Sequence, residues 1–212
     1  MPRRYAMDKR APVTAAVRQR IIDAALDELV AVDGGPLTLQ GVAERADLAL
    51  RTLYNHFPNR DALLSAAFLH HTAQTRAAVE AMSLPDTQPE AQLRHAVAAY
   101  YSRYAAMGPR LGALLSLRGF PDLDEQVAAL RAWRREVLHR IIQRARQTGA
   151  LAVPESTAAA LAFMTTSHAS WEILVKELDG LDAEPSDVAG EALSAALFRP
   201  SGICTTDRLP PE

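Results

Sequence analysis

The sequence holds one cysteine, Cys204, and only 6% aromatic residues. A single cysteine excludes an intrachain disulfide and fits a reducing compartment. No uninterrupted apolar run approaches the roughly 18–20 residues of a membrane span, and the basic first 20 residues lack the apolar stretch of a secretory signal. These absences predict a soluble, cytoplasmic protein without membrane contact.

The sequence also lacks the motifs of common enzymes and metal sites. It has no G-x-S-x-G nucleophile turn, no glycine-rich phosphate loop and no cysteine at metal-site spacing. Its histidines have no acid or nucleophile at motif spacing, and the neighbours His70 and His71 point to different helix faces. We therefore expect no enzyme activity, no catalytic residue, no metal and no cofactor.

What is present is a helical pattern along the whole chain. Hydrophobic residues make up 49% of the 212 positions, and no window alternates for long with the period of a strand. Glycine and proline breaks divide the pattern into about nine helices, among them one continuous helix over 155–179. The expected class is all-α, with a basic flexible arm at 1–13, a small domain at 14–60, a larger helical domain at 61–199 and a flexible tail at 200–212.

Charge is unevenly distributed along the chain. Residues 1–60 hold nine Lys and Arg against seven acids, whereas the remainder holds fourteen against eighteen. Residues 1–20 alone carry six basic side chains and one acid. Two interpretations stay open for this arm: a disordered tail, or an electrostatic contact with phosphate.

Two short helices, expected at 39–46 and 50–56, are joined by the three residues 47–49. This spacing is typical of a helix-turn-helix, whose second helix lies in the major groove of DNA. Leu50, Leu53 and Phe57 share one face and are predicted to anchor that helix. Residues 50–60 contain no acid, as a surface that faces phosphate requires.

The other side chains of 50–56 suit groove edges and phosphates. Arg51 can donate to guanine O6 and N7, and Thr52 can offer its methyl group to thymine or its hydroxyl to phosphate. Tyr54 and His56 reach the DNA backbone, and Asn55 lies beside them. The alternatives are a packing role for Tyr54 and plain solvation or capping for His56 and Asn55.

The motifs along residues 18–64 resemble the DNA-binding domain of the TetR family of bacterial transcriptional regulators. The matching elements are Ile22-x-x-Ala25, Gly35, Thr38, Val42-Ala43, Thr52-Leu53-Tyr54-x-x-Phe57 and Asp61-x-Leu63-Leu64. The resemblance implies an all-α homodimer with an N-terminal helix-turn-helix and a variable ligand-binding and dimerisation domain.

By position, the resemblance implies that Thr38, Gln40 and Arg60 contact phosphate, with Gln40 and Thr38 near the bases in some members. The sequence departs from the family in three places. Asp47 replaces the usual turn glycine, although Asp tolerates the left-handed region better than most residues. Gly41 lies inside a helix, and Arg60 replaces the usual lysine.

The helix expected over 155–179 is apolar on two sides, which predicts burial on both sides. The resemblance implies that the last two helices of each subunit form a four-helix dimer interface, and the alternative is a hairpin buried in its own chain. The candidate interface residues are Ala162, Ala169, Trp171, Leu193 and Leu197.

Aromatic residues and methionines in the larger domain are candidates for a ligand pocket, with plain core packing as the alternative. They are Tyr100, Tyr104, Met107, Leu114, Trp133, Phe163, Met164 and His168. The helix over 123–147 is rich in arginine, which indicates either a solvated face or an inward arginine suited to an acidic ligand.

Together these features predict a ligand-responsive DNA-binding transcriptional regulator, a repressor released from a palindromic operator by a small molecule. The expected partners are double-stranded DNA, a small-molecule effector and a second copy of the chain. The alternative is a helical protein-interaction module, or an enzyme that uses a C-terminal pocket without binding DNA.

Overall fold

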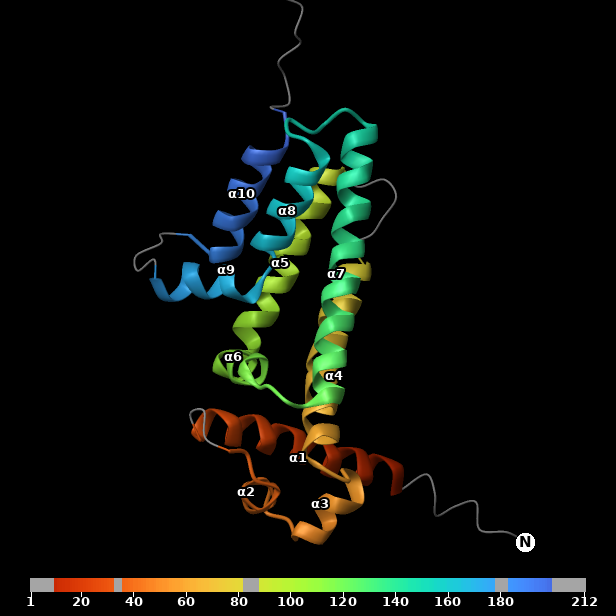
Figure 1. The fold of residues 1–212 in the computed structure, drawn as a ribbon, viewed down its shortest axis with the longest axis vertical. Helices are drawn as coiled ribbons and strands as arrows, with labels where there is room; N and C mark the ends of the chain where they lie inside the picture. Colours follow the sequence, from red (N-terminus) through yellow and green to blue (C-terminus); the bar gives the residue numbers. More distant parts are fainter. Residues whose placement is uncertain (1–9, 33–35, 82–87, 178–182, 200–212) are drawn as a thin grey trace, which may run out of the picture. The chain divides into compact units, whose positions relative to one another are not determined.

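The computed structural model describes residues 10–32, 36–81, 88–177 and 183–199 (Figure 1). Within these ranges the chain is helical and has no strand, which confirms the all-α class, and one isolated antiparallel bridge joins Leu151 to Phe198. The elements are α1 (Arg10–Ala31), α2 (Leu39–Arg45), α3 (Leu50–His56), α4 (Arg60–Ala81), α5 (Pro89–Met107), α6 (Pro109–Ser116), α7 (Pro121–Gln147), α8 (Glu155–Thr165), α9 (His168–Glu172), the π-helix η1 (Ile173–Glu177) and α10 (Pro185–Leu197).

The chain divides into two compact units. The first comprises the residues up to Ala78 together with Arg103–Trp133, and the second comprises Val79–Ser102 together with the residues from Arg134 onward. Helices α4, α5 and α7 each contribute residues to both units. No helix in the described ranges is both long and apolar enough to cross a membrane.

α1 begins at Arg10, four residues before the expected start at 14. The helix includes Pro12, and a proline is tolerated in a first turn because the amide it lacks would have no partner there. Residues 10–13 of the expected flexible arm are therefore helical, whereas residues 1–9 and the tail at 200–212 lie outside the described residues.

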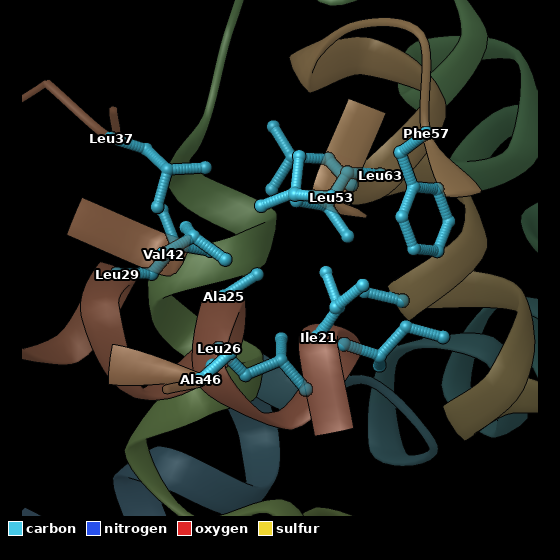
Figure 2. Packing of buried hydrophobic residues seen from close by; sticks show 14 of the residues in the cluster. Ile21, Ala25, Leu26, Leu29, Leu37, Val42, Ala46, Leu53, Phe57 and Leu63 are labelled. Atoms are coloured by element: carbon cyan, nitrogen blue, oxygen red, sulfur yellow. The ribbon is translucent and has the colours of Figure 1, made fainter. Parts of the chain in front are cut away.

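The core of the first unit joins α1 to the short helices that follow it. Apolar side chains recur along α1 at three- and four-residue steps, with Ile21 fully buried and Leu29 4% exposed. Figure 2 shows them directed toward Val42 of α2, Leu53 of α3 and Leu63 of α4. Burying one such side chain is worth about 1.5–3 kcal/mol. This shared cluster therefore fixes the two short helices against α1.

The turn between α2 and α3 places Asp47 in the left-handed region, with φ 50°. The amide of Asp47 donates to the Glu44 carbonyl at 3.0 Å, and the amide of Leu48 donates to the Ala43 carbonyl at 2.9 Å. These are the two bonds of a Schellman motif, which usually ends a helix at glycine. Asp47 thus takes over the role of the usual turn glycine, as the sequence predicted.

Gly41 permits a close contact between α2 and α1. A Cβ at this position would lie 2.5 Å from Glu28 Oε1 and 3.1 Å from Thr38 Oγ1. Glu28 also pairs with Arg45, whose Nε lies 2.8 Å from Glu28 Oε2. The missing side chain therefore leaves room for a carboxylate that ties α1 to the end of α2.

The expectation of one continuous helix over 155–179 is wrong. α8 ends at Thr165, α9 begins at His168 and changes direction (Figure 1), and η1 follows. The Thr166 hydroxyl donates to the Ala162 carbonyl at 2.8 Å, and Ser167 Oγ accepts from the Ser170 amide at 3.2 Å as the N-cap of α9. Consecutive hydroxyl side chains compete in this way with the backbone hydrogen bonds of the helix. Because of this break, the described part has ten α-helices where about nine were expected.

One arginine of α7 points inward in the second unit. Arg134 Nη1 donates to the Thr166 carbonyl at 3.0 Å, and its guanidinium lies 4.2 Å from the centre of the Phe163 ring. The Tyr101 hydroxyl donates to the neighbouring Thr165 carbonyl at 2.9 Å. A cation at the carboxyl end of a helix is favourable. Arg134 therefore closes α8 where the helix breaks.

We expect Gly41→Ala to stabilise the protein less than its helical position suggests. Glycine to alanine in a helix gains about 1 kcal/mol, but the new methyl group must displace Glu28 and its ion pair with Arg45. In a Glu28→Ala background the same substitution should give the larger gain. Urea unfolding of the four proteins measures this coupling, and equal gains in both backgrounds would contradict the close contact.

Candidate nucleic-acid interface

α3 is anchored through one face. Leu53 is fully buried, Phe57 is 1% exposed, and Leu50 packs against the same cluster. This confirms the core face that the sequence predicted. Phe57 ends the helix in an extended conformation, with φ −139° and ψ 115°, which is the conformation favoured before a proline such as Pro58.

The opposite face of α3 carries polar side chains. Arg51 and Asn55 are exposed, Tyr54 is 50% exposed, and Thr52 and His56 are half-buried. Positions 51, 54 and 55 follow the three- and four-residue spacing of a single helix face. Because residues 48–60 contain no acid, this face offers donors without a negative charge. A single helix of this kind fits the major groove of B-DNA, which is about 12 Å wide.

A groove of about 430 Å³ lies beside α3 in the first unit. It brings together four of the predicted contact residues, Thr38, Gln40, Tyr54 and Arg60, and Asn59 also lines it. These side chains come from the start of α2, from α3 and from the start of α4. A phosphate backbone that followed the groove would therefore meet three elements at once.

Two residues at the start of α2 are held by their own helix. Thr38 is the N-cap, and its Oγ1 accepts from the Gly41 amide at 3.1 Å, so the hydroxyl proton can be donated to a phosphate oxygen. Gln40 Nε2 donates to Glu44 Oε1 at 2.7 Å, and the Gln40 side chain is exposed. α2 thus presents a hydroxyl and an amide in fixed positions at the groove.

Arg60 has a structural partner that the sequence did not reveal. Its Nη1 donates to the Leu37 carbonyl at 3.0 Å, and its guanidinium lies 5.9 Å from the centre of the Phe120 ring. A guanidinium carries five N–H donors, so the bond to Leu37 is compatible with a phosphate contact. Arg60 therefore also ties the start of α4 to the segment before α2.

Sequence reasoning missed Arg18 of α1 as a candidate contact. Its guanidinium lies 4.5 Å from the centre of the Phe57 ring, at the end of α3, and the side chain is exposed. Stacking on an aromatic face fixes a guanidinium while leaving its edge donors available. The only sequence signal was the basic character of residues 1–20, which does not single out Arg18.

His71 of α4 and Arg103 of α5 form a polar pair inside the first unit. Arg103 Nε donates to the His71 carbonyl at 2.8 Å, and Arg103 Nη2 lies 2.7 Å from His71 Nδ1. Burial, together with the charge of Arg103, lowers the pKa of His71 to about 4. The imidazole is therefore neutral near pH 7, with Nδ1 accepting and Nε2 protonated. His71 Nε2 is buried and has no partner among the described residues, so it can donate to a ligand or a water molecule.

The predicted ligand residues differ in exposure. Leu114 is 1% exposed and belongs to the core cluster of the first unit, which makes it a core residue of the single chain. Met164 is 62% exposed and faces outward. The remaining candidates are buried or half-buried, and as ligand contacts they stay predictions: Tyr100, Tyr104, Met107, Trp133, Phe163 and His168.

Most of the predicted dimer-interface residues pack inside their own chain. Ala162 and Leu197 are fully buried, Leu193 is 4% exposed, and Trp171 is 9% exposed, whereas Ala169 is exposed. The apolar pattern correctly indicated burial, but the second unit itself supplies that burial. As residues of a dimer interface, these five stay predictions.

Within the described ranges, no three His, Cys, Asp or Glu side chains are grouped as a metal ion would require. Cys204 lies outside those ranges.

Comparisons with known proteins agree on the family of the small domain and on the fold. Residues 21–67 match the family model described as bacterial regulatory proteins, tetR family. A bacterial regulatory protein in the tetR family from Rhodococcus RHA1 has a TM-score of 0.68 and 21% identity, over 85% of this chain and 94% of that chain. A TetR-like transcriptional regulator from Rhodococcus sp. RHA1 has a TM-score of 0.67 and 18% identity, over 86% and 93%.

A further similar structure is the transcriptional regulator FadR from Bacillus subtilis in complex with stearoyl-CoA. Its TM-score is 0.65 and its identity 17%, over 84% of this chain and 98% of that chain. At these identities the structures establish the fold. A comparison with curated protein sequences gives no match.

We expect Arg51→Ala to weaken binding to a preferred DNA sequence by about 1–3 kcal/mol and to relax base preference at one position of each half-site. The reason is that Arg51 is an exposed forked donor in the first turn of α3. Affinities for single-base variants of the preferred sequence measure the effect, with Arg140→Ala on the exposed surface of α7 as the control. Equal losses on preferred and random DNA would reduce Arg51 to a phosphate contact.

Proposed function

We propose that this chain, which belongs to the TetR family of bacterial regulatory proteins by its match over residues 21–67, is a homodimeric repressor that a small molecule releases from a palindromic operator. The family and the fold make it a DNA-binding transcriptional regulator. DNA reading, dimerisation and release by an effector each rest on a separate feature of the molecule.

The observation that carries the proposal is the two-sided character of α3. Its apolar side is fixed in the core by Leu53 and Phe57, and its other side exposes Arg51 and Asn55 next to Tyr54. The neighbouring groove adds a capped hydroxyl at Thr38. A rigid helix with outward donors can read base edges, and the adjacent groove can hold the DNA backbone. The two together support base reading combined with phosphate positioning.

Exposed apolar residues on α8 and α10 support the dimer. Ala192, Ala195 and Ala196 follow one face of α10, and Ala160 and Met164 lie four residues apart on α8. The two helices contact each other within the chain, so pairing these faces between two copies would form a four-helix interface. Such a dimer would present two α3 helices to adjacent major grooves, about 34–36 Å or a multiple apart.

The effector part of the proposal rests on the polar interior of the first unit and on a fold relative. His71 presents a buried N–H beside Arg103, where a ligand acceptor could bind. FadR from Bacillus subtilis, which shares the fold, was solved with stearoyl-CoA. A ligand releases the operator only if it binds the conformer with low DNA affinity more tightly than the other.

Selection of sequences from a random DNA library by the purified full-length protein tests the proposal. We expect an inverted repeat whose half-site centres are about one duplex turn, or a small multiple of it, apart. The selected DNA should be bound at least about 10³-fold more tightly than random DNA. Equal affinity for both pools, or no binding to either, would reject the proposal and favour a protein-interaction module.

We expect Arg18→Ala and Arg60→Ala to weaken binding to all DNA sequences alike. Each lost phosphate contact should reduce the slope of log K against log salt by about one, and therefore by about two for a dimer that loses both copies. Titrations at several salt concentrations measure this slope, with Arg140→Ala as the exposed control. An unchanged slope would mean that Arg18 and Arg60 have structural roles only.

We expect Ala192→Glu combined with Ala195→Glu to give a folded monomer with weak operator binding. If the variant dimerised through this face, the two copies would bury four unpaired carboxylates in a symmetric interface, which is unfavourable. Sedimentation measures the mass, circular dichroism the fold, and titration the operator affinity. Ala132→Glu, at an exposed position of α7, is the matched control. A variant that sediments as a dimer would exclude this face of α10.

A further inference from the structure

The first turn of α7 is capped by a residue distant in sequence. The amide of Asp122 donates to Asp61 Oδ2 at 3.0 Å, and the amide of Leu123 donates to Asp61 Oδ1 at 3.1 Å. α7 begins at Pro121, which has no amide hydrogen, and the preceding Phe120 has no side-chain acceptor. The cap that many helices obtain from their own N-cap residue is thus supplied by the carboxylate of α4.

The residues next to Asp61 connect further segments. Asn59 Oδ1 accepts from the Ala62 amide at 2.8 Å and caps α4 itself. Arg60 donates to the Leu37 carbonyl at 3.0 Å and approaches the Phe120 ring. Leu37 immediately precedes Thr38, the N-cap of α2. Residues 59–61 therefore link the start of α2, the start of α4 and the start of α7.

We propose that Asp61 is a positioning residue that couples the amino end of α7 to the operator-binding segment at Leu37 and Thr38. While Asp61 holds the first amides of α7, the start of α4 stays where Arg60 reaches Leu37, and α2 keeps its place at the DNA-facing groove. Displacing the start of α7 would release this constraint. This inference rests on the proposed DNA-binding function.

Coupling of this kind is reciprocal, which makes it testable without an effector. If the position of α7 affects operator affinity, operator binding must in turn hold the start of α7 more firmly. Amide hydrogen exchange reports this directly, because the Asp122 and Leu123 amides are the groups that Asp61 binds. α10 provides an internal reference for any general slowing of exchange caused by DNA.

The experiment uses the full-length protein with the operator obtained by selection. Exchange over residues 120–126, relative to 185–197, is measured with and without operator for the wild type, Asp61→Asn and Asp124→Asn. Asp61→Asn removes the charge and one strong acceptor. Asp124→Asn removes another acid of the first turn of α7, whose carboxylate caps no helix within the part of the chain that the structure describes.

In the wild type we expect operator to slow exchange at the start of α7 more than in α10. Asp61→Asn should lower operator affinity by about fivefold or more and abolish the extra protection of α7. The lost cap should lower the melting temperature by only a few degrees, and the protection of α3 by DNA should be retained. Asp124→Asn should change neither the affinity nor the protection by more than about twofold.

Operator binding by the wild type with no extra protection of α7 would overturn this inference and leave the proposed function intact. The same conclusion would follow if Asp61→Asn lost stability but kept operator affinity per folded molecule. Failure of the wild type to bind any selected DNA would overturn the proposed function and the inference with it. If Asp61→Asn does not fold, the wild-type measurement still tests whether operator binding protects the start of α7.

Discussion

A seven-residue helix is not stable by itself in water, because helix formation begins with an unfavourable first turn. α2 and α3 each contain seven residues, so both depend on burial against α1. The positions of Arg51 and Asn55 are therefore only as well defined as the packing of Leu53 and Phe57 beneath them. The proposed recognition of DNA would depend on the apolar side of α3 as much as on the polar side, since a loosely held donor discriminates poorly between base pairs.

The same core extends beyond the three helices that resemble a DNA-binding domain. Leu114 of α6 and Leu123 of α7 belong to the cluster that contains Leu53. Arg110 at the start of α6 also pairs with Asp27 of α1. Because protein cores are densely packed and do not deform continuously, a shift of α6 or α7 has to be accommodated by α1 and the short helices. The first unit thus joins α1, α2 and α3 to α6 and α7 in one packing arrangement.

The helix-turn-helix could be predicted because its determinants are local, including the left-handed turn at Asp47. The break at Thr166 could not be, because the apolar periodicity continues through it and only hydroxyl groups mark the place where α8 ends. The stacking of Arg18 on Phe57 joins α1 to the end of α3, and no local spacing reveals it. Periodicity also showed that Leu193 is buried, yet it could not say whether its own chain or a second copy provides the partner.

The capping of α7 by Asp61 also bears on the order in which the chain folds. The acceptor lies 61 residues before the Asp122 amide, so this contact forms only after a long loop has closed, and such contacts are late and slow. The 27-residue helix can propagate from its interior, but its first turn must wait for α4. During synthesis Asp61 leaves the ribosome first, and the carboxylate is in place before the helix it completes. In the folded protein the same end of α7 is where local unfolding would begin once α4 moves.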